Sequence, residues 1–229
     1  LGRAQLEQKK YAKAEQVFEA LVNGKDGAEA HLWQGRVFQR LGKHTDAEAI
    51  VAAALKRYAN DPLKPDLLFD LGQYQMAQEK FEKAGQSLDQ LLREFKEYDQ
   101  RADAVRHNAL CKHRAEDYAA SLALCRDFLA ANAEAREAAD MMFLEAENRF
   151  FLNQTKEAVA AYEAFIKAHE DHGQLPVARM RVGEAYFEGE EWGQALTAFE
   201  GILKTNPKGA VYDQLEFLMT ECHYQKRDW

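Results

Sequence analysis

Small and apolar residues recur along this chain at nearly constant intervals. A small residue stands at Ala14, Ala47, Ala84, Ser121, Ala158 and Ala195, first 33 residues apart and then 37 residues apart four times. Four residues after these stand Phe18, Val51, Leu88, Cys125, Tyr162 and Phe199. Because residues three and four apart share one helix face, the pattern predicts an amphipathic helix that recurs every 37 residues.

A second column of small residues predicts another helix ahead of each of these. Twelve residues before the first column stand Gly2, Gly35, Gly72, Ala109, Ala146 and Gly183. A glycine or alanine at a fixed place indicates that two helices cross there at close range, since a larger side chain would push the backbones apart. Glycines in turns such as 41–43 and 188–190 indicate where the first helix stops. One such pair cannot bury its apolar stripe alone, so we expect neighbouring pairs to stack.

These columns resemble the tetratricopeptide repeat (TPR). The best match lies in residues 176–207, where the repeat's small, aromatic and proline positions hold Gly183, Tyr186, Trp192, Ala195, Phe199 and Pro207. The resemblance implies an all-α fold, a right-handed α-solenoid of antiparallel helix pairs with five full units of about 37 residues and a partial unit at each end. Trp229 would begin the next second helix. We expect residues 1–229 to form a single superhelical domain and to be a fragment of a longer chain.

The charge is distributed unevenly. The formal net charge is -8, but residues 1–114 carry 19 Lys and Arg against 17 Asp and Glu, whereas residues 115–229 carry 11 against 21. A nucleic-acid-binding protein would need a basic face, so we expect no nucleic-acid partner. The acidic half would instead attract a basic protein. No apolar run is long enough to predict direct membrane insertion by this segment.

The sequence offers little for catalysis or metal binding. It has no phosphate-cradling glycine loop, metalloprotease helix motif or nucleophile elbow, so we expect no enzyme activity and no cofactor. His169 and His172 lie near Asp171 in a junction between repeats, and two histidines without a third placed ligand predict no metal site. Three cysteines form no disulfide framework, and we expect buried thiols.

The resemblance also implies where a ligand would lie, because positions 2, 5, 9 and 12 of each first helix line an inner groove in this family. In the last three first helices, positions 5, 9 and 12 hold Phe143, Glu147, Phe150, Met180, Glu184, Phe187, Phe217, Glu221 and Tyr224. The three glutamates form an acidic ladder along successive first helices, and the aromatic residues and Met180 flank it. This arrangement predicts binding of an apolar segment that carries Lys or Arg. Reversing its three glutamates to lysine is expected to abolish such binding and to leave the helices intact.

Other interpretations of these residues stay open. Phe143, Met180 and Phe217 are alternatively core residues, the glutamates are alternatively solvated, and a helix of the same protein is an alternative occupant of the groove. A second patch, Arg36, Arg40, Arg106 and His113, is a candidate for an anionic partner, although isolated surface arginines usually serve solvation.

We therefore expect a non-catalytic scaffold or adaptor that binds a protein or peptide in its concave groove. The alternative is a structural subunit that is permanently assembled into a larger multiprotein complex. The sequence leaves the partner's identity, the oligomeric state and the compartment open. The 37-residue spacing resembles that of TPR proteins of the bacterial cell envelope and leans towards the periplasm, whereas unpaired cysteines lean towards the cytoplasm.

Overall fold

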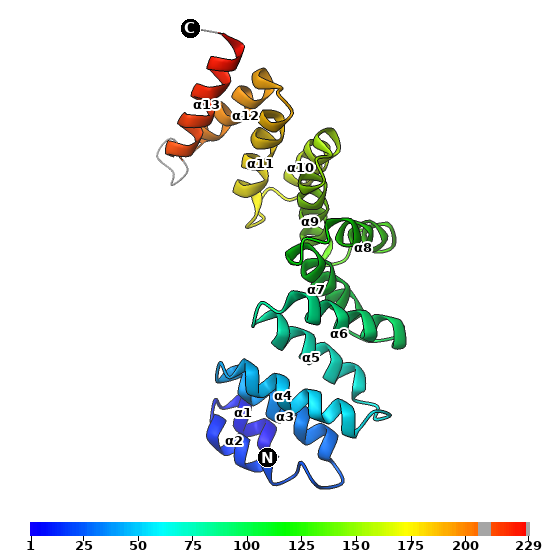
Figure 1. Ribbon diagram of the computed structural model, residues 1–229. Helices are drawn as coiled ribbons and strands as arrows, with labels where there is room; N and C mark the ends of the chain where they lie inside the picture. Colours follow the sequence, from blue (N-terminus) through cyan, green and yellow to red (C-terminus); the bar gives the residue numbers. More distant parts are fainter. Residues whose placement is uncertain (206–211, 228–229) are drawn as a thin grey trace. The chain divides into compact units, whose positions relative to one another are not determined.

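The computed structural model describes residues 1–205 and 212–227, and within these ranges it contains helices and turns but no strand (Figure 1). The helices are α1 (Gly2–Glu7), α2 (Tyr11–Glu19), α3 (Gly27–Arg40), α4 (His44–Arg57), α5 (Lys64–Met76), α6 (Phe81–Glu94), α7 (Arg101–Arg114), α8 (Tyr118–Ala131), α9 (Ala138–Phe151), α10 (Thr155–Ala168), α11 (Leu175–Glu188), α12 (Trp192–Thr205) and α13 (Tyr212–Lys226). The expectations for Pro207 and Trp229 fall outside the described residues.

The helix boundaries follow the repeat that the sequence predicts. From α3 onwards, each odd-numbered helix begins 37 residues after the previous one, from Gly27 to Tyr212. The even-numbered helices begin at Tyr11 and His44 and then every 37 residues up to Trp192. We call the odd-numbered members first helices and the even-numbered members second helices. The predicted all-α organisation in helix pairs is thereby confirmed.

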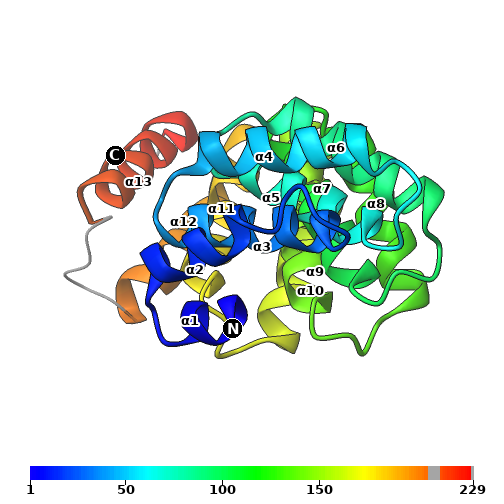
Figure 2. The same ribbon diagram turned by 90° about the horizontal axis from the view of Figure 1, so that it is seen from below.

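The chain divides into two compact units, Leu1–Glu116 and Asp117–Trp229. Unit 1 contains α1 to α7, and unit 2 contains α8 to α13. Within each unit every helix packs against the next one along the chain, and three first helices also contact the following first helix, α3 with α5, α5 with α7 and α9 with α11. Both Figure 1 and Figure 2 show α2 beside α1 and α3 in unit 1. The single domain expected over residues 1–229 stays a prediction.

The glycine column lies where the sequence places it, at the crossing of a first helix with its own second helix. A Cβ atom added to Gly183 would lie 2.3 Å from Cε1 of Phe199. At Gly2, Gly35 and Gly72 it would meet Phe18, Val51 and Leu88 at 2.6, 2.8 and 2.9 Å. Each partner belongs to the apolar column of the second helix, so the two columns pack against each other and fix how closely each pair of helices approaches.

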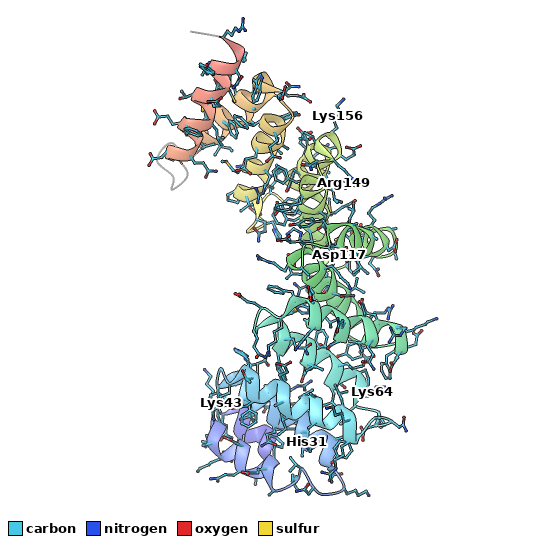
Figure 3. All side chains as sticks on the ribbon, viewed as in Figure 1. His31, Lys43, Lys64, Asp117, Arg149 and Lys156 are labelled. Carbon is cyan, nitrogen blue, oxygen red and sulfur yellow. The ribbon has the colours of Figure 1, made fainter. Side chains whose placement is uncertain are left out.

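A left-handed residue makes each turn from a first to a second helix. Two residues before the second helix, φ is between 57° and 72° at Lys9, Gly42, Glu79, Glu116, Asn153 and Glu190. Glycine tolerates this conformation best, yet it stands in only one of these turns. In the turn at 188–190 the first helix stops at the glycine as expected, since α11 ends at Glu188 with Gly189 as its C-cap; Gly189 has φ -76°, and the next residue, Glu190, has the left-handed geometry. In Figure 3, Arg149 and Lys156 flank the equivalent turn between α9 and α10.

The three cysteines are free thiols buried in the core, as predicted. Burial raises the pKa of Cys111 and of Cys125 to about 12. Because the thiolate is the reactive form, we expect all three thiols of the native protein to react with Ellman's reagent at pH 8 only as fast as the protein opens, and to react at once in urea. A fast phase of one thiol or more in the native protein would contradict this assignment.

Candidate functional site

The predicted groove residues of unit 2 differ widely in exposure. Glu147 and Phe150 of α9 are buried, whereas Phe217 and Tyr224 of α13 are 69% and 56% exposed. The remaining members have intermediate exposure: Phe143, Met180, Glu184, Phe187 and Glu221. The predicted groove residues are thus mostly buried on α9 and mostly exposed on α13.

Arg181 of α11 forms ion pairs with the first two glutamates of the acidic ladder, Glu147 and Glu184. Its Nε donates to Oε1 of Glu147 at 3.1 Å, and its Nη1 donates to Oε2 of Glu184 at 2.8 Å. The Tyr162 hydroxyl donates a further hydrogen bond to Glu147. Burial lowers the pKa of Arg181, but the carboxylates of Glu147 and Glu184 outweigh it and raise that pKa above its usual range. The guanidinium therefore stays charged and balances one of the two carboxylates that it contacts.

The aromatic members of the ladder pack mainly inside unit 2. Phe143 lies with its ring centroid 5.5 Å from that of Phe165 and 6.2 Å from that of Tyr162. The ring of Phe150 lies 4.9 Å below the guanidinium of Arg181. Phe187 packs edge-on against Trp192, with centroids 5.2 Å apart. These three rings therefore contribute to packing within unit 2, whether or not they also contact a ligand.

Phe217 is exposed at a position where α3 and α5 bury an apolar side chain. The equivalent residues Leu32 of α3 and Phe69 of α5 are 3% and 4% exposed, and Met180 of α11 packs against the core that includes Leu215. Glu221 lies on the same helix as Phe217 and accepts a hydrogen bond from Gln225 at 2.7 Å. The open part of the predicted site thus consists of Phe217, Glu221 and Tyr224 on α13.

The second predicted patch belongs to unit 1 and is divided between two helices. Arg36 and Arg40 lie on α3, Arg106 and His113 lie on α7, and α5 packs against both helices. Arg36 is engaged internally, since its Nε donates to Oδ2 of Asp70 at 2.7 Å. Arg106 contacts Asp103 on its own helix at 3.4 Å. Of the four residues, Arg40 is the one that lies exposed.

Sequence reasoning missed Arg181 and Asp70, the partners that neutralise Glu147 and Arg36. It also missed Arg3 and Trp33: the guanidinium carbons of Arg3 and Arg36 lie 4.6 and 4.8 Å from the ring centroid of Trp33. A signal was present, because Asp70 follows Arg36 by 34 residues and Arg181 follows Glu147 by the same interval. Opposite charges repeated at that interval indicate contacts between successive first helices.

The junction histidines of unit 2 pack against an aromatic ring. His169 and His172 lie 5.5 and 5.1 Å from Phe165, measured between ring centroids, and Nε2 of His172 lies 3.4 Å from a carboxylate oxygen of Asp140. Nowhere in residues 1–205 and 212–227 do three potential metal ligands cluster. In the same ranges no helix is both long and apolar enough to cross a membrane.

Solved structures with the same fold include a TPR protein from Parabacteroides merdae ATCC 43184 (16% identity, TM-score 0.69, covering 87% of this chain and 73% of that one) and Pseudomonas aeruginosa PilF (16% identity, TM-score 0.66, covering 94% and 93%). YrrB, described as a TPR protein with an unusual peptide-binding site, is 15% identical, with a TM-score of 0.68 and coverage of 86% and 96%. No curated protein sequence matches the chain.

Identities this low show the fold alone, an α-solenoid of stacked helix pairs. The sequence itself carries further evidence, because the family model described as tetratricopeptide repeat matches residues 1–62 and 143–210, more than half of the chain. These ranges include Gly2, Gly35 and Gly183 of the glycine column, and the ion-paired residues Arg36, Glu147 and Arg181. The chain belongs to the tetratricopeptide repeat family.

Proposed function

We propose that this protein is a scaffold or adaptor that binds a basic, apolar segment of a partner protein at the first-helix face of unit 2, centred on α13. Tetratricopeptide repeats are in general non-catalytic scaffolds for protein–protein interaction. The observation that carries the proposal is the exposed face of Phe217, Glu221 and Tyr224. Residues three, four and seven apart share one helix face, so these side chains form a single stripe.

Electrostatics favours a basic segment at this stripe. The neighbouring helix α11 adds Glu184 and Glu188, and Arg181 is the cation beside them. Burial raises the pKa of Glu188, and the nearby carboxylate of Glu184 raises it further. A lysine or arginine brought by a partner would relieve this repulsion, while its apolar residues would cover the ring of Phe217. The peptide-binding site ascribed to YrrB supports a peptide as the kind of occupant.

The test uses two labelled 20-residue amphipathic peptides that differ only in carrying Lys or Glu at every polar position, with binding followed by fluorescence anisotropy. The Lys peptide is expected to bind and the Glu peptide not. Glu221→Lys and Phe217→Ala should each weaken the Lys peptide about tenfold, a change of roughly 1.4 kcal/mol. The control Glu216→Lys makes the same charge change on another face of α13 and should change affinity less than about threefold. If Glu216→Lys weakened binding of the Lys peptide as much as Glu221→Lys, the affinity would depend on net charge alone, and the proposed face would be refuted.

A structural subunit is the second candidate, favoured by exposed apolar side chains at the other end of the chain. Leu21 is an exposed large apolar residue, and with Val17 it lines one surface hollow of α1 and α2. Permanent assembly buries large apolar areas of this kind. Native mass spectrometry of the protein isolated from its source separates the two: a subunit would arrive in a stoichiometric complex that survives dilution, whereas an adaptor would arrive alone or dissociate.

A further inference from the structure

Two ion pairs, each with a buried carboxylate and a partly buried guanidinium, occupy the same repeat positions with opposite polarity. In unit 1, Arg36 of α3 pairs with Asp70 of α5; in unit 2, Glu147 of α9 pairs with Arg181 of α11. In each pair the first residue directly follows a small-column residue, and the second stands two residues before the next small-column residue. The earlier helix thus supplies the cation in unit 1 and the carboxylate in unit 2.

The surroundings of the two pairs match despite this exchange. The carboxylates of Asp70 and Glu147 are buried, and each accepts a hydrogen bond from a tyrosine, Tyr74 or Tyr162. Arg36 and Arg181 are each about a quarter exposed, and each guanidinium lies over an aromatic ring, Trp33 at 4.8 Å and Phe150 at 4.9 Å. The two sites therefore share a tyrosine hydroxyl on the carboxylate and an aromatic ring on the guanidinium, although these groups come from different helices, and the charges are on opposite helices.

Apolar packing alone distinguishes the two junctions poorly. At both junctions buried apolar side chains of three successive helices form one core, from α3, α4 and α5 in unit 1 and from α9, α10 and α11 in unit 2, and both repeats are 37 residues long. The helix pair of α3 would therefore find the right spacing and the right apolar stripe on the helix pair of α11, in its own chain or in a second copy. That stacking would bring Arg36 against Arg181, and the converse error would bring Glu147 against Asp70. Burying like charges is strongly unfavourable, because neither can be neutralised by its neighbour.

We propose that the reversed polarity of these pairs selects which helix pairs stack on one another and suppresses mis-stacked and domain-swapped forms. Apolar residues would often stabilise such a contact equally well. An ion pair is useful there because it excludes a competing arrangement. The inference concerns how the repeats choose their neighbours and does not depend on the proposed ligand face.

The test reverses one junction so that both have the same polarity. In the double variant Arg36→Glu with Asp70→Arg, the native pair is kept with exchanged ends, and the carboxylate introduced at position 36 becomes complementary to Arg181 of a second copy. After refolding from urea at high protein concentration, size-exclusion chromatography with light scattering should show at least a threefold larger fraction of non-native oligomers than the wild type. The reciprocal variant Glu147→Arg with Arg181→Glu should behave alike and serves if the first does not fold.

The quadruple variant that reverses both junctions is the matched control. It contains every substitution of the two double variants but restores opposite polarity, so its oligomer fraction should return to that of the wild type. Two outcomes would overturn the proposal: double variants that refold as cleanly as the wild type, or a quadruple variant that mis-assembles as much as the double variants do. The second outcome would mean that the substitutions act by destabilising each junction separately.

Discussion

Gly183→Ala should lower the free energy of unfolding of unit 2 by about 2 kcal/mol, although alanine is ordinarily the better helix residue. The new methyl carbon would lie 2.3 Å from the ring of Phe199, whose side chain is fully buried between α11, α12 and α13. Because the ring packs against buried side chains of α12 and α13, we expect α11 and α12 to separate. Urea denaturation followed by circular dichroism measures the loss.

Gly193→Ala provides the control within the same helix pair. Gly193 is exposed in the first turn of α12, and a Cβ atom added there would meet nothing within 4 Å. The same chemical change should therefore raise the free energy of unfolding by about 0.5 kcal/mol through helix propensity alone. If both variants were stabilised, the close crossing of α11 and α12 at Gly183 would be refuted. If both were destabilised alike, the effect would not arise from packing against Phe199.

Positions defined by packing could be predicted from the sequence. Gly183 and Phe199 stand in two columns of constant spacing, and the repeat itself reveals that one column must be small because the other is large. The start of each second helix was predictable for the same reason, since Trp192 repeats the place of Tyr118 and Thr155. The same contact recurs in every repeat, so several repeats indicate it independently of one another.

Positions defined by a single contact could not be predicted in this way. Glu147, Glu184 and Glu221 form one column in the sequence, but the structure buries the first, pairs the first two with Arg181 and leaves the third on the more open α13. Charge is not periodic here, and an ion pair between helices depends on the neighbouring first helix as well as on the residue's own repeat. The exposure of Phe217 also depends on what packs over α13, which no column in the sequence encodes.

Glu147→Lys should destabilise unit 2 by about 3–5 kcal/mol, the usual cost of breaking a buried pair. The substitution removes the acceptor of the Tyr162 and Arg181 hydrogen bonds and buries a second cation beside the guanidinium. The sequence-based expectation that reversing this glutamate leaves the helices intact is therefore revised for Glu147. Glu221→Lys makes the same change at the third ladder position, where it should cost less than about 0.5 kcal/mol. Urea titrations of both variants measure the difference, and equal midpoints would contradict the burial of Glu147.

Exchanging the charges identifies how much of that loss belongs to the pair itself. Glu147→Arg combined with Arg181→Glu keeps one cation and one carboxylate at the contact, so the double variant should be more stable than the sum of its single variants predicts by about 1–3 kcal/mol. Recovery should stay incomplete, because the Tyr162 hydroxyl would face a guanidinium, which cannot accept its hydrogen bond. Tyr162→Phe should then lower the free energy of unfolding less in this double variant than in the wild type. A double variant no more stable than the sum would show that Glu147 and Arg181 act independently, and that Glu147 is held in the core by Tyr162 alone.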